Sequence, residues 1–85
     1  MISLPAYKYD LAVLISEGTS IERAAHQLGI SPKTAEWYRS HIWRDCGLRK
    51  TAFAARPHAL KRLLSEGKIT KEEHDKYFES VNNLF

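Results

Sequence analysis

The sequence predicts an all-α fold with four short helices, two of them joined by a tight turn, and one extra C-terminal helix. Apolar residues recur every three or four positions through most of the 85 residues, as in helices that bury one side. Glycines or a serine-proline pair separate these segments, and no stretch shows the alternation of a half-buried strand. We expect one domain over residues 1–67 and a helical extension over residues 68–85.

The first helix is expected to run from Leu4 to Glu17. Apolar side chains follow helical spacing over these residues, Pro5 is tolerated in a first turn, and Gly18 can end the helix. A second helix is expected over residues 21–28, where two alanines let a neighbouring helix approach closely. These two segments supply part of the predicted core.

Side chains that can cap a helix N-terminus precede both the second and the third helix. Thr19 or Ser20 can cap the second helix, and Thr19 also forms a capping box with Glu22. Gly29 can adopt the left-handed conformation that ends this helix. The serine-proline pair at residues 31–32 then starts a third helix, because serine caps well and proline suits the first helical position.

Breaks in the pattern divide the rest of the chain. The third helix is expected to end near Cys46, because a glycine follows it. A fourth helix should begin after Thr51 and kink or break near Arg56, since Pro57 removes a backbone hydrogen bond and disfavours helical geometry before it. A last helix should begin at Thr70, which forms another capping box with the glutamate three residues later.

The second and third helices form a helix-turn-helix, a motif whose second helix enters a groove of DNA. A buried stripe at helical spacing consists of Ala35, Tyr38, Ile42 and Cys46. That stripe turns a second set outward: Lys33, Glu36, Trp37, Ser40 and Arg44. A large aromatic side chain among charged and hydroxyl groups is unusual on a solvated surface, so we expect Trp37 to face DNA. Two alternatives are that it folds onto its own domain or lies in a dimer contact.

Positive charge is concentrated in the middle of the chain. Residues 31–62 contain eight lysines and arginines but only two acidic residues, Glu36 and Asp45, whereas both flanking segments are slightly acidic. The overall net charge of +3 hides this contrast. A basic segment that coincides with a helix-turn-helix predicts double-stranded DNA as the partner.

Each outward side chain suits a particular contact. Glu36 can accept from cytosine N4, Trp37 can pack on a thymine methyl or a deoxyribose, and Ser40 can face any base. Arg44 has the reach for a phosphate or for a bidentate contact to guanine. The phosphate contacts are expected from Lys33 and Thr34 at the helix N-terminus and from Arg39.

These residues resemble the DNA-binding domain of the LuxR/GerE/FixJ type of bacterial transcription regulators. The matching pieces are LISEG at 14–18, the run from Ala25 to Thr34, the run from Glu36 to Arg44, and the glycine-leucine pair at 47–48. The resemblance implies a four-helix domain in which the third helix reads bases through Glu36, Trp37 and Ser40. It also implies phosphate contacts, which we place at Ser31, Lys33, Thr34, Arg39, Arg49, Lys50 and Thr51. Asp45 departs from the family pattern, because it replaces a lysine near the DNA backbone.

A homodimer is expected, because the fourth helix commonly pairs two subunits in this family. The last helix carries apolar side chains that could join this interface or pack on the domain's own helices. The residues expected at the interface are Phe53, Leu60, Leu64, Tyr77, Phe78, Val81 and Leu84.

Other function classes find no support in the sequence. His26, His41, His58 and His74 have no ligand spacing with Cys46 or with one another, so we expect no metal and no cofactor. No nucleophile-base pattern or phosphate loop indicates an enzyme. No segment is typical of a signal peptide or a membrane span, and the single cysteine fits a reducing cytoplasm. Cys46 is expected in the core, and a redox-sensing thiol is the alternative.

The sequence as a whole predicts a stand-alone, cytoplasmic transcription regulator that binds duplex DNA, with repression slightly favoured. The competing hypothesis is a protein-interaction module that pairs with a full-length regulator and blocks it. The acidic, aromatic C-terminal segment and Asp45 favour this alternative, whereas the basic middle segment favours DNA.

Overall fold

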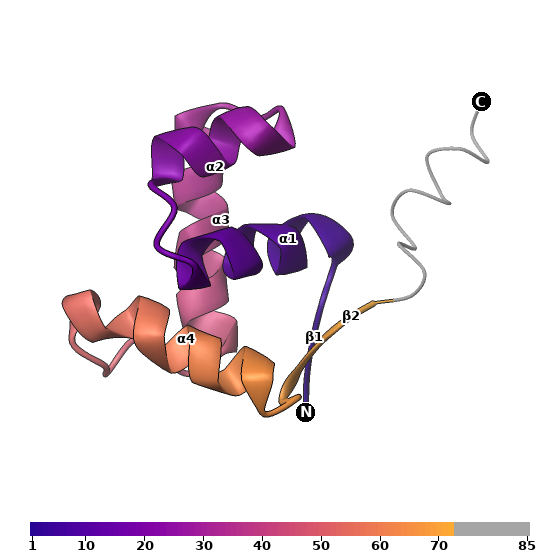
Figure 1. The fold of residues 1–85 in the computed structure, drawn as a ribbon, viewed down its shortest axis with the longest axis vertical. Coiled ribbons are helices and arrows are strands. Elements are labelled where there is room, and N and C mark those ends of the chain that lie inside the picture. Colours follow the sequence, from indigo (N-terminus) through magenta and orange to yellow (C-terminus); the bar gives the residue numbers. More distant parts are fainter. Residues whose placement is uncertain (73–85) are drawn as a thin grey trace.

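A computed structural model of the chain describes residues 1–72, which form four α-helices and a two-stranded sheet (Figure 1). The elements in chain order are β1 (Ile2–Leu4), α1 (Ala6–Ser16), α2 (Ile21–Leu28), α3 (Pro32–Asp45), the 3-10 helix η1 (Phe53–Ala55), α4 (Arg56–Ser65) and β2 (Ile69–Lys71). The predominance of helices confirms the predicted class in its coarse form. The two strands correct it, because the described residues are not purely α-helical.

The core lies where α1 crosses α3 and α4 packs against α1. In Figure 1, α3 stands upright, α1 crosses it, and α4 lies across its lower end. Leu11, Ile42 and Leu60 are fully buried at the centre of this arrangement. The small side chains of Ala24 and Ala35 are also fully buried, so that α2 and α3 can approach each other closely. This packing leaves the opposite side of α3 uncovered.

The two helices predicted on either side of a tight turn are present as α2 and α3. The N-cap of α2 is Ser20, whose hydroxyl oxygen accepts from the backbone N–H of Arg23 at 3.3 Å. The expected capping box of Thr19 is therefore not the cap that forms. Gly29 ends α2 in the left-handed conformation, with φ of 70°. The bounds of α2 match the prediction.

The start of α3 also follows from local chemistry. Ser31 is the N-cap, and its hydroxyl oxygen accepts from the backbone N–H of Thr34 at 3.1 Å. Pro32 takes the first helical position, as its missing N–H allows. The helix ends at Asp45, with Cys46 as the C-cap. The predicted end was one residue too long.

The first helix starts later than predicted, because Leu4 belongs to β1. Proline disfavours helical geometry in the residue before it, so the Leu4–Pro5 step keeps the chain extended. The two strands run parallel, with Ile2 opposite Ile69 and Leu4 opposite Lys71. Leu4 and Ile69 are both buried. The sheet thus ties the beginning of the chain to residues that follow α4.

The predicted C-terminal helix is corrected at its start. Thr70 lies in β2, paired with Ser3, and does not cap a helix. Residues 69–71 of the expected extension therefore pack with the helical domain. The remainder of that predicted helix, including Tyr77, Phe78, Val81 and Leu84, lies outside the described residues.

Pro57 was expected inside one helix that begins after Thr51, but it lies instead at the start of a separate helix. The predicted helix over residues 52–55 is the 3-10 helix η1, and α4 begins directly after it at Arg56. Pro57 lies in the first turn of α4, where no N–H is needed for the helix ladder. The predicted break near Arg56 is therefore confirmed as a change of helix type.

Candidate nucleic-acid interface

The uncovered side of α3 carries the residues that the sequence predicted to face DNA. Among the described residues, the exposed side chains on this helix include Lys33, Glu36, Trp37, Ser40 and Arg44. They follow one another at helical spacing, so they form one continuous strip. We call this strip the α3 face. Its existence follows from the burial of Ala35 and Ile42 on the other side.

Trp37 stands on the α3 face with 59% of its surface exposed. Its ring lies against the ring of His41, one turn later, with centroids 4.1 Å apart. The ring centroids of Trp37 and Tyr38 are 5.5 Å apart. The ring of Tyr38 in turn contacts the ring of Tyr7 of α1, with centroids 4.9 Å apart. These contacts fix the orientation of the indole while most of it stays accessible. The alternative in which Trp37 folds into its own domain is not what the described residues show.

At the N-terminus of α3, the predicted phosphate contacts are close together. The hydroxyl of Ser31 donates to the hydroxyl oxygen of Thr34 at 2.8 Å, in addition to accepting from its N–H. Lys33 is exposed beside them. A helix N-terminus with backbone amides, hydroxyls and a lysine favours an anion.

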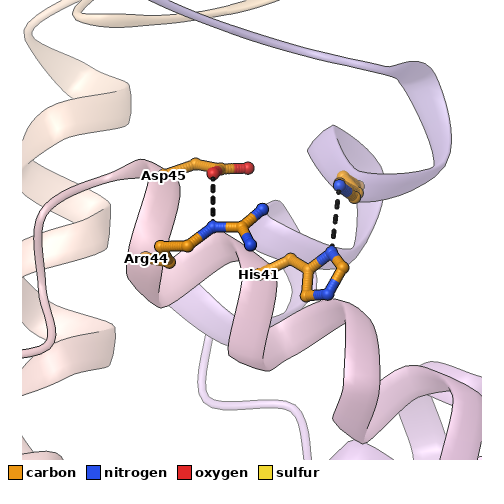
Figure 2. A network of polar contacts seen from close by, with 4 residues as sticks. His41, Arg44 and Asp45 are labelled. Carbon is orange, nitrogen blue, oxygen red and sulfur yellow. Dashed lines mark hydrogen bonds and ion pairs between the residues drawn. The ribbon is translucent and has the colours of Figure 1, made fainter.

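The C-terminal end of the α3 face is electrically different. Figure 2 shows Arg44 turned toward Asp45, and its Nε donates to Oδ1 of that carboxylate at 3.2 Å. Asp45 therefore partly neutralises the guanidinium that was expected to contact a base. Both side chains are exposed, so this ion pair is weak and can open.

The second contact in Figure 2 joins α3 to α1: Lys8 Nζ lies 3.5 Å from Nδ1 of His41. Partial desolvation of the imidazole lowers the pKa of His41 below its usual 6.5, and the positive charges of Lys8 and Arg44 lower it further. The sequence analysis gave no role to Lys8 or His41, since the two lie 33 residues apart in the chain.

Two of the remaining predicted phosphate contacts, Arg39 and Arg49, line an open hollow of about 490 Å³. Lys50 follows Arg49 in the loop and is exposed, but neither Lys50 nor Thr51 lines the hollow. The carbonyl oxygen of Thr51 accepts from Nε of Arg56 at 3.0 Å, so its backbone is held in place. The structure thus brings Arg49 of the loop to the same hollow as Arg39 of α3.

Two side chains of this hollow were missed by the sequence analysis. Trp43 is 5% exposed and belongs to the core, although the predicted stripe passed over it. A wider apolar stripe, in which residues eight positions apart share a face, would have included it, since Ala35 lies eight residues earlier. Arg56 was counted only as charge. The signal that could have found it is the position of Arg56 at the start of a helix, directly after a loop. The carbonyl groups of such a loop need hydrogen-bond donors, which an arginine can supply.

The dimerisation residues predicted on the fourth helix differ in how much of each side chain is exposed. Leu60 is completely buried in the core, so it cannot offer its side chain to a second copy. Leu64 is half-buried and packs against the same core. Phe53 is 62% exposed, but the guanidinium groups of Arg39 and Arg56 lie over its ring at 5.6 and 5.4 Å. Of these three, only Phe53 reaches the surface broadly.

Cys46 lies in the core, as predicted, and is free of disulfide bonding. Burial raises the pKa of its thiol to about 11, and the nearby Asp45 adds to this effect. Within residues 1–72, no group of His, Cys, Asp and Glu side chains is arranged to hold a metal ion. No helix in that part of the chain has the length and apolar character needed to cross a bilayer.

Comparisons with family models, with curated proteins and with solved structures each found no match for this chain. The α3 face and the charges around it are therefore the features of the described residues that bear on function.

Proposed function

We propose that the protein is a transcription regulator that binds duplex DNA by inserting α3 into the major groove. The observation that carries the proposal is the α3 face, on which an oriented and exposed Trp37 lies between Lys33 and Arg44. A helix of this kind fits the width of the major groove, and its side chains match the chemistry of base edges. The resemblance to the LuxR/GerE/FixJ type supports the same orientation.

Phosphate contacts on both sides of α3 complete the proposed interface. Ser31, Lys33 and Thr34 lie at its N-terminus, and Arg39 and Arg49 lie beside its middle and end. Such contacts supply affinity and orient the protein without reading sequence. In this arrangement Glu36, Trp37 and Ser40 are left to read bases.

A salt titration of binding to random-sequence duplex tests the proposal. Each phosphate neutralised contributes about 0.9 to the slope of log K against log salt concentration, so several contacts give a slope of several units. A slope close to zero would argue against DNA as the partner. If the slope is steep, selection of bound fragments from a genomic library would then identify the preferred site.

The proposal includes a homodimer, because helix-turn-helix proteins commonly read two half-sites with two symmetric subunits. Leu60 takes no part in it, since its side chain is buried within one subunit. Sedimentation equilibrium of the full chain checks this part of the proposal. A monomer at the concentration that occupies the preferred duplex would contradict it.

A second candidate function is a protein-interaction module that pairs with a larger regulator. The observation that favours it is the ion pair of Arg44 with Asp45, which withdraws one positive charge from the α3 face. In this case a partner protein, and not duplex, would cover Trp37. The salt titration separates the two candidates, because only binding to DNA releases counterions in proportion to phosphate contacts.

A further inference from the structure

We propose that the open hollow between α3, the loop over residues 46–52 and the start of α4 binds a phosphate group, and that duplex DNA supplies it as a backbone phosphodiester. The source of the phosphate rests on the proposed function, whereas the site itself does not. The hollow measures about 490 Å³ and lies beside Ser40, on the border of the α3 face. We call it the arginine hollow, because Arg39, Arg49 and Arg56 line it.

Three guanidinium groups converge there without a carboxylate partner. Within the described part of the chain, none of Arg39, Arg49 and Arg56 forms an ion pair, although four other basic side chains do. Like charges gathered in this way repel one another, so an anion between them is stabilised. Arginine also presents N–H groups in a planar fork that matches phosphate oxygens.

Arg56 is held in position before any ligand arrives. Its Nε donates to the carbonyl of Thr51 at 3.0 Å, and its Nη2 donates to the carbonyl of Arg49 at 2.9 Å. The same guanidinium lies 5.4 Å from the ring centroid of Phe53 and 5.8 Å from that of Trp43. An arginine has five N–H donors, so those not used by the two carbonyls stay available for an anion. The clamp also fixes the loop that carries Arg49.

Trp43, which lines the arginine hollow, has a donor without an acceptor within residues 1–72. Trp43 is 5% exposed, and its Nε1 is buried without a hydrogen-bond partner among the described residues. Trp43 also lines an adjoining hollow of about 180 Å³, which shares Arg39 and Phe53 with the first. A buried N–H without an acceptor is unfavourable, and such groups are rare. In the proposed complex, a phosphate oxygen is the acceptor for this N–H.

Glu36 lines the arginine hollow as well, and its charge opposes an anion there. Three guanidinium groups outnumber the single carboxylate, so the local charge stays positive. Glu36 is exposed on the α3 face, where the proposed function gives it a base contact. Replacing it with glutamine is therefore expected to strengthen phosphate binding while changing sequence preference. The hollow lies at the edge of the α3 face. In the proposed complex, this edge meets the DNA backbone that borders the groove.

The test follows the indole N–H resonances of the full chain by two-dimensional proton-nitrogen NMR. The two tryptophans provide an internal control, since Trp43 lines the arginine hollow and Trp37 does not. Inorganic phosphate is titrated first, with sodium chloride at equal ionic strength as the reference. We expect a saturable shift of the Trp43 resonance with phosphate and little change at Trp37. A short random-sequence duplex should shift both. A Trp43 resonance that responds to phosphate no more than to chloride would overturn the proposal.

Variants identify the guanidinium groups involved. Arg49→Ala removes a side chain for which the structure gives no contact of its own, so the fold should be retained while phosphate affinity falls about tenfold. Arg56→Lys keeps the charge but loses the planar fork, and we expect a similar loss. Arg62→Ala is the matched control, because it removes the same charge from α4 outside the arginine hollow. If Arg49→Ala and Arg62→Ala weaken phosphate binding equally, the site is not the arginine hollow.

The outcomes also separate this inference from the proposed function. With duplex, Arg49→Ala should reduce the salt slope by about one. Duplex binding that leaves the Trp43 resonance and the Arg49→Ala slope unchanged would overturn the inference while the proposed function stands. Phosphate binding at Trp43 with no binding of duplex would support the site and overturn DNA as the source of its ligand.

Discussion

Two substitutions at Ser31, the N-cap of α3, separate its effect on stability from its effect on DNA binding. Ser31 accepts from the backbone N–H of Thr34 at 3.1 Å and donates to its hydroxyl at 2.8 Å. Ser31→Ala removes both contacts, and the loss of such a cap costs about 1 kcal/mol. In a domain of this size, that loss lowers the melting temperature by about 4–8 °C. Thermal unfolding followed by circular dichroism measures the shift.

Ser31→Asp separates the cap from the phosphate contact. Aspartate caps as well as serine and favours the positive end of the helix dipole, so the melting temperature should be unchanged or slightly raised. The added charge would lie close to a phosphate in the proposed complex. At 4 Å, such repulsion amounts to about 1 kcal/mol in bulk water and about 4 kcal/mol near a protein surface. A loss of about fivefold or more in duplex affinity is expected at low salt.

Fluorescence anisotropy with labelled duplex gives the affinity. The control is Ser31→Asn, because asparagine caps a helix as well as aspartate and has a similar size but adds no charge. A Ser31→Asp variant that binds duplex as tightly as the unchanged protein would refute the phosphate contact, and so would equal losses of affinity for Ser31→Asp and Ser31→Asn. A normal melting temperature for Ser31→Ala would refute the role of Ser31 as a cap.

Five other predictions concern the α3 face and the core. Trp37→Ala should cost about 1–3 kcal/mol on the preferred duplex and flatten sequence preference; equal losses on preferred and random duplex in anisotropy would argue against a base contact. Asp45→Asn releases Arg44, so duplex affinity should rise about two- to fivefold with a steeper salt dependence, and an unchanged titration would place that end of α3 away from DNA. Cys46 should react with iodoacetamide at least tenfold more slowly than in the unfolded chain at mildly alkaline pH, since the folded thiol titrates near pH 11 and only the thiolate reacts. Because the folded state keeps this proton, stability should fall as the pH rises from about 9 through 11, and a urea titration across this range checks it. Ile69→Ala should cost about 2–5 kcal/mol in urea unfolding, whereas a loss close to zero would show that β2 is dispensable.

The sequence was most informative where structure is decided by neighbouring residues. The left-handed glycine at residue 29 and the cap at Ser31 are local features, and both are present as expected. The α3 face was predictable because helical spacing alone separates Ala35 and Ile42 from Trp37. The same locality explains the one-residue error at the end of α3, since helix ends depend on competing local hydrogen bonds.

Contacts between distant residues were beyond the sequence pattern. The strands Ile2–Leu4 and Ile69–Lys71 are three residues each, too short for an alternating pattern to identify them. Their pairing also turned Thr70, which reads as a helix cap, into a strand residue. The burial of Leu60 was equally hidden, because an apolar residue on a helix can face either its own core or a partner.

The sequence alone determined where α2 begins and ends, where α3 begins and which side of α3 stays exposed, because caps, glycines and helical spacing act over a few residues. Only the tertiary structure decided that Lys8 of α1 contacts His41 and that Arg56 clamps the loop beside Arg39. Those arrangements depend on how α1, α3, the loop and α4 pack together. The helix-turn-helix follows from local chemistry, whereas the arginine hollow beside it follows from the fold as a whole.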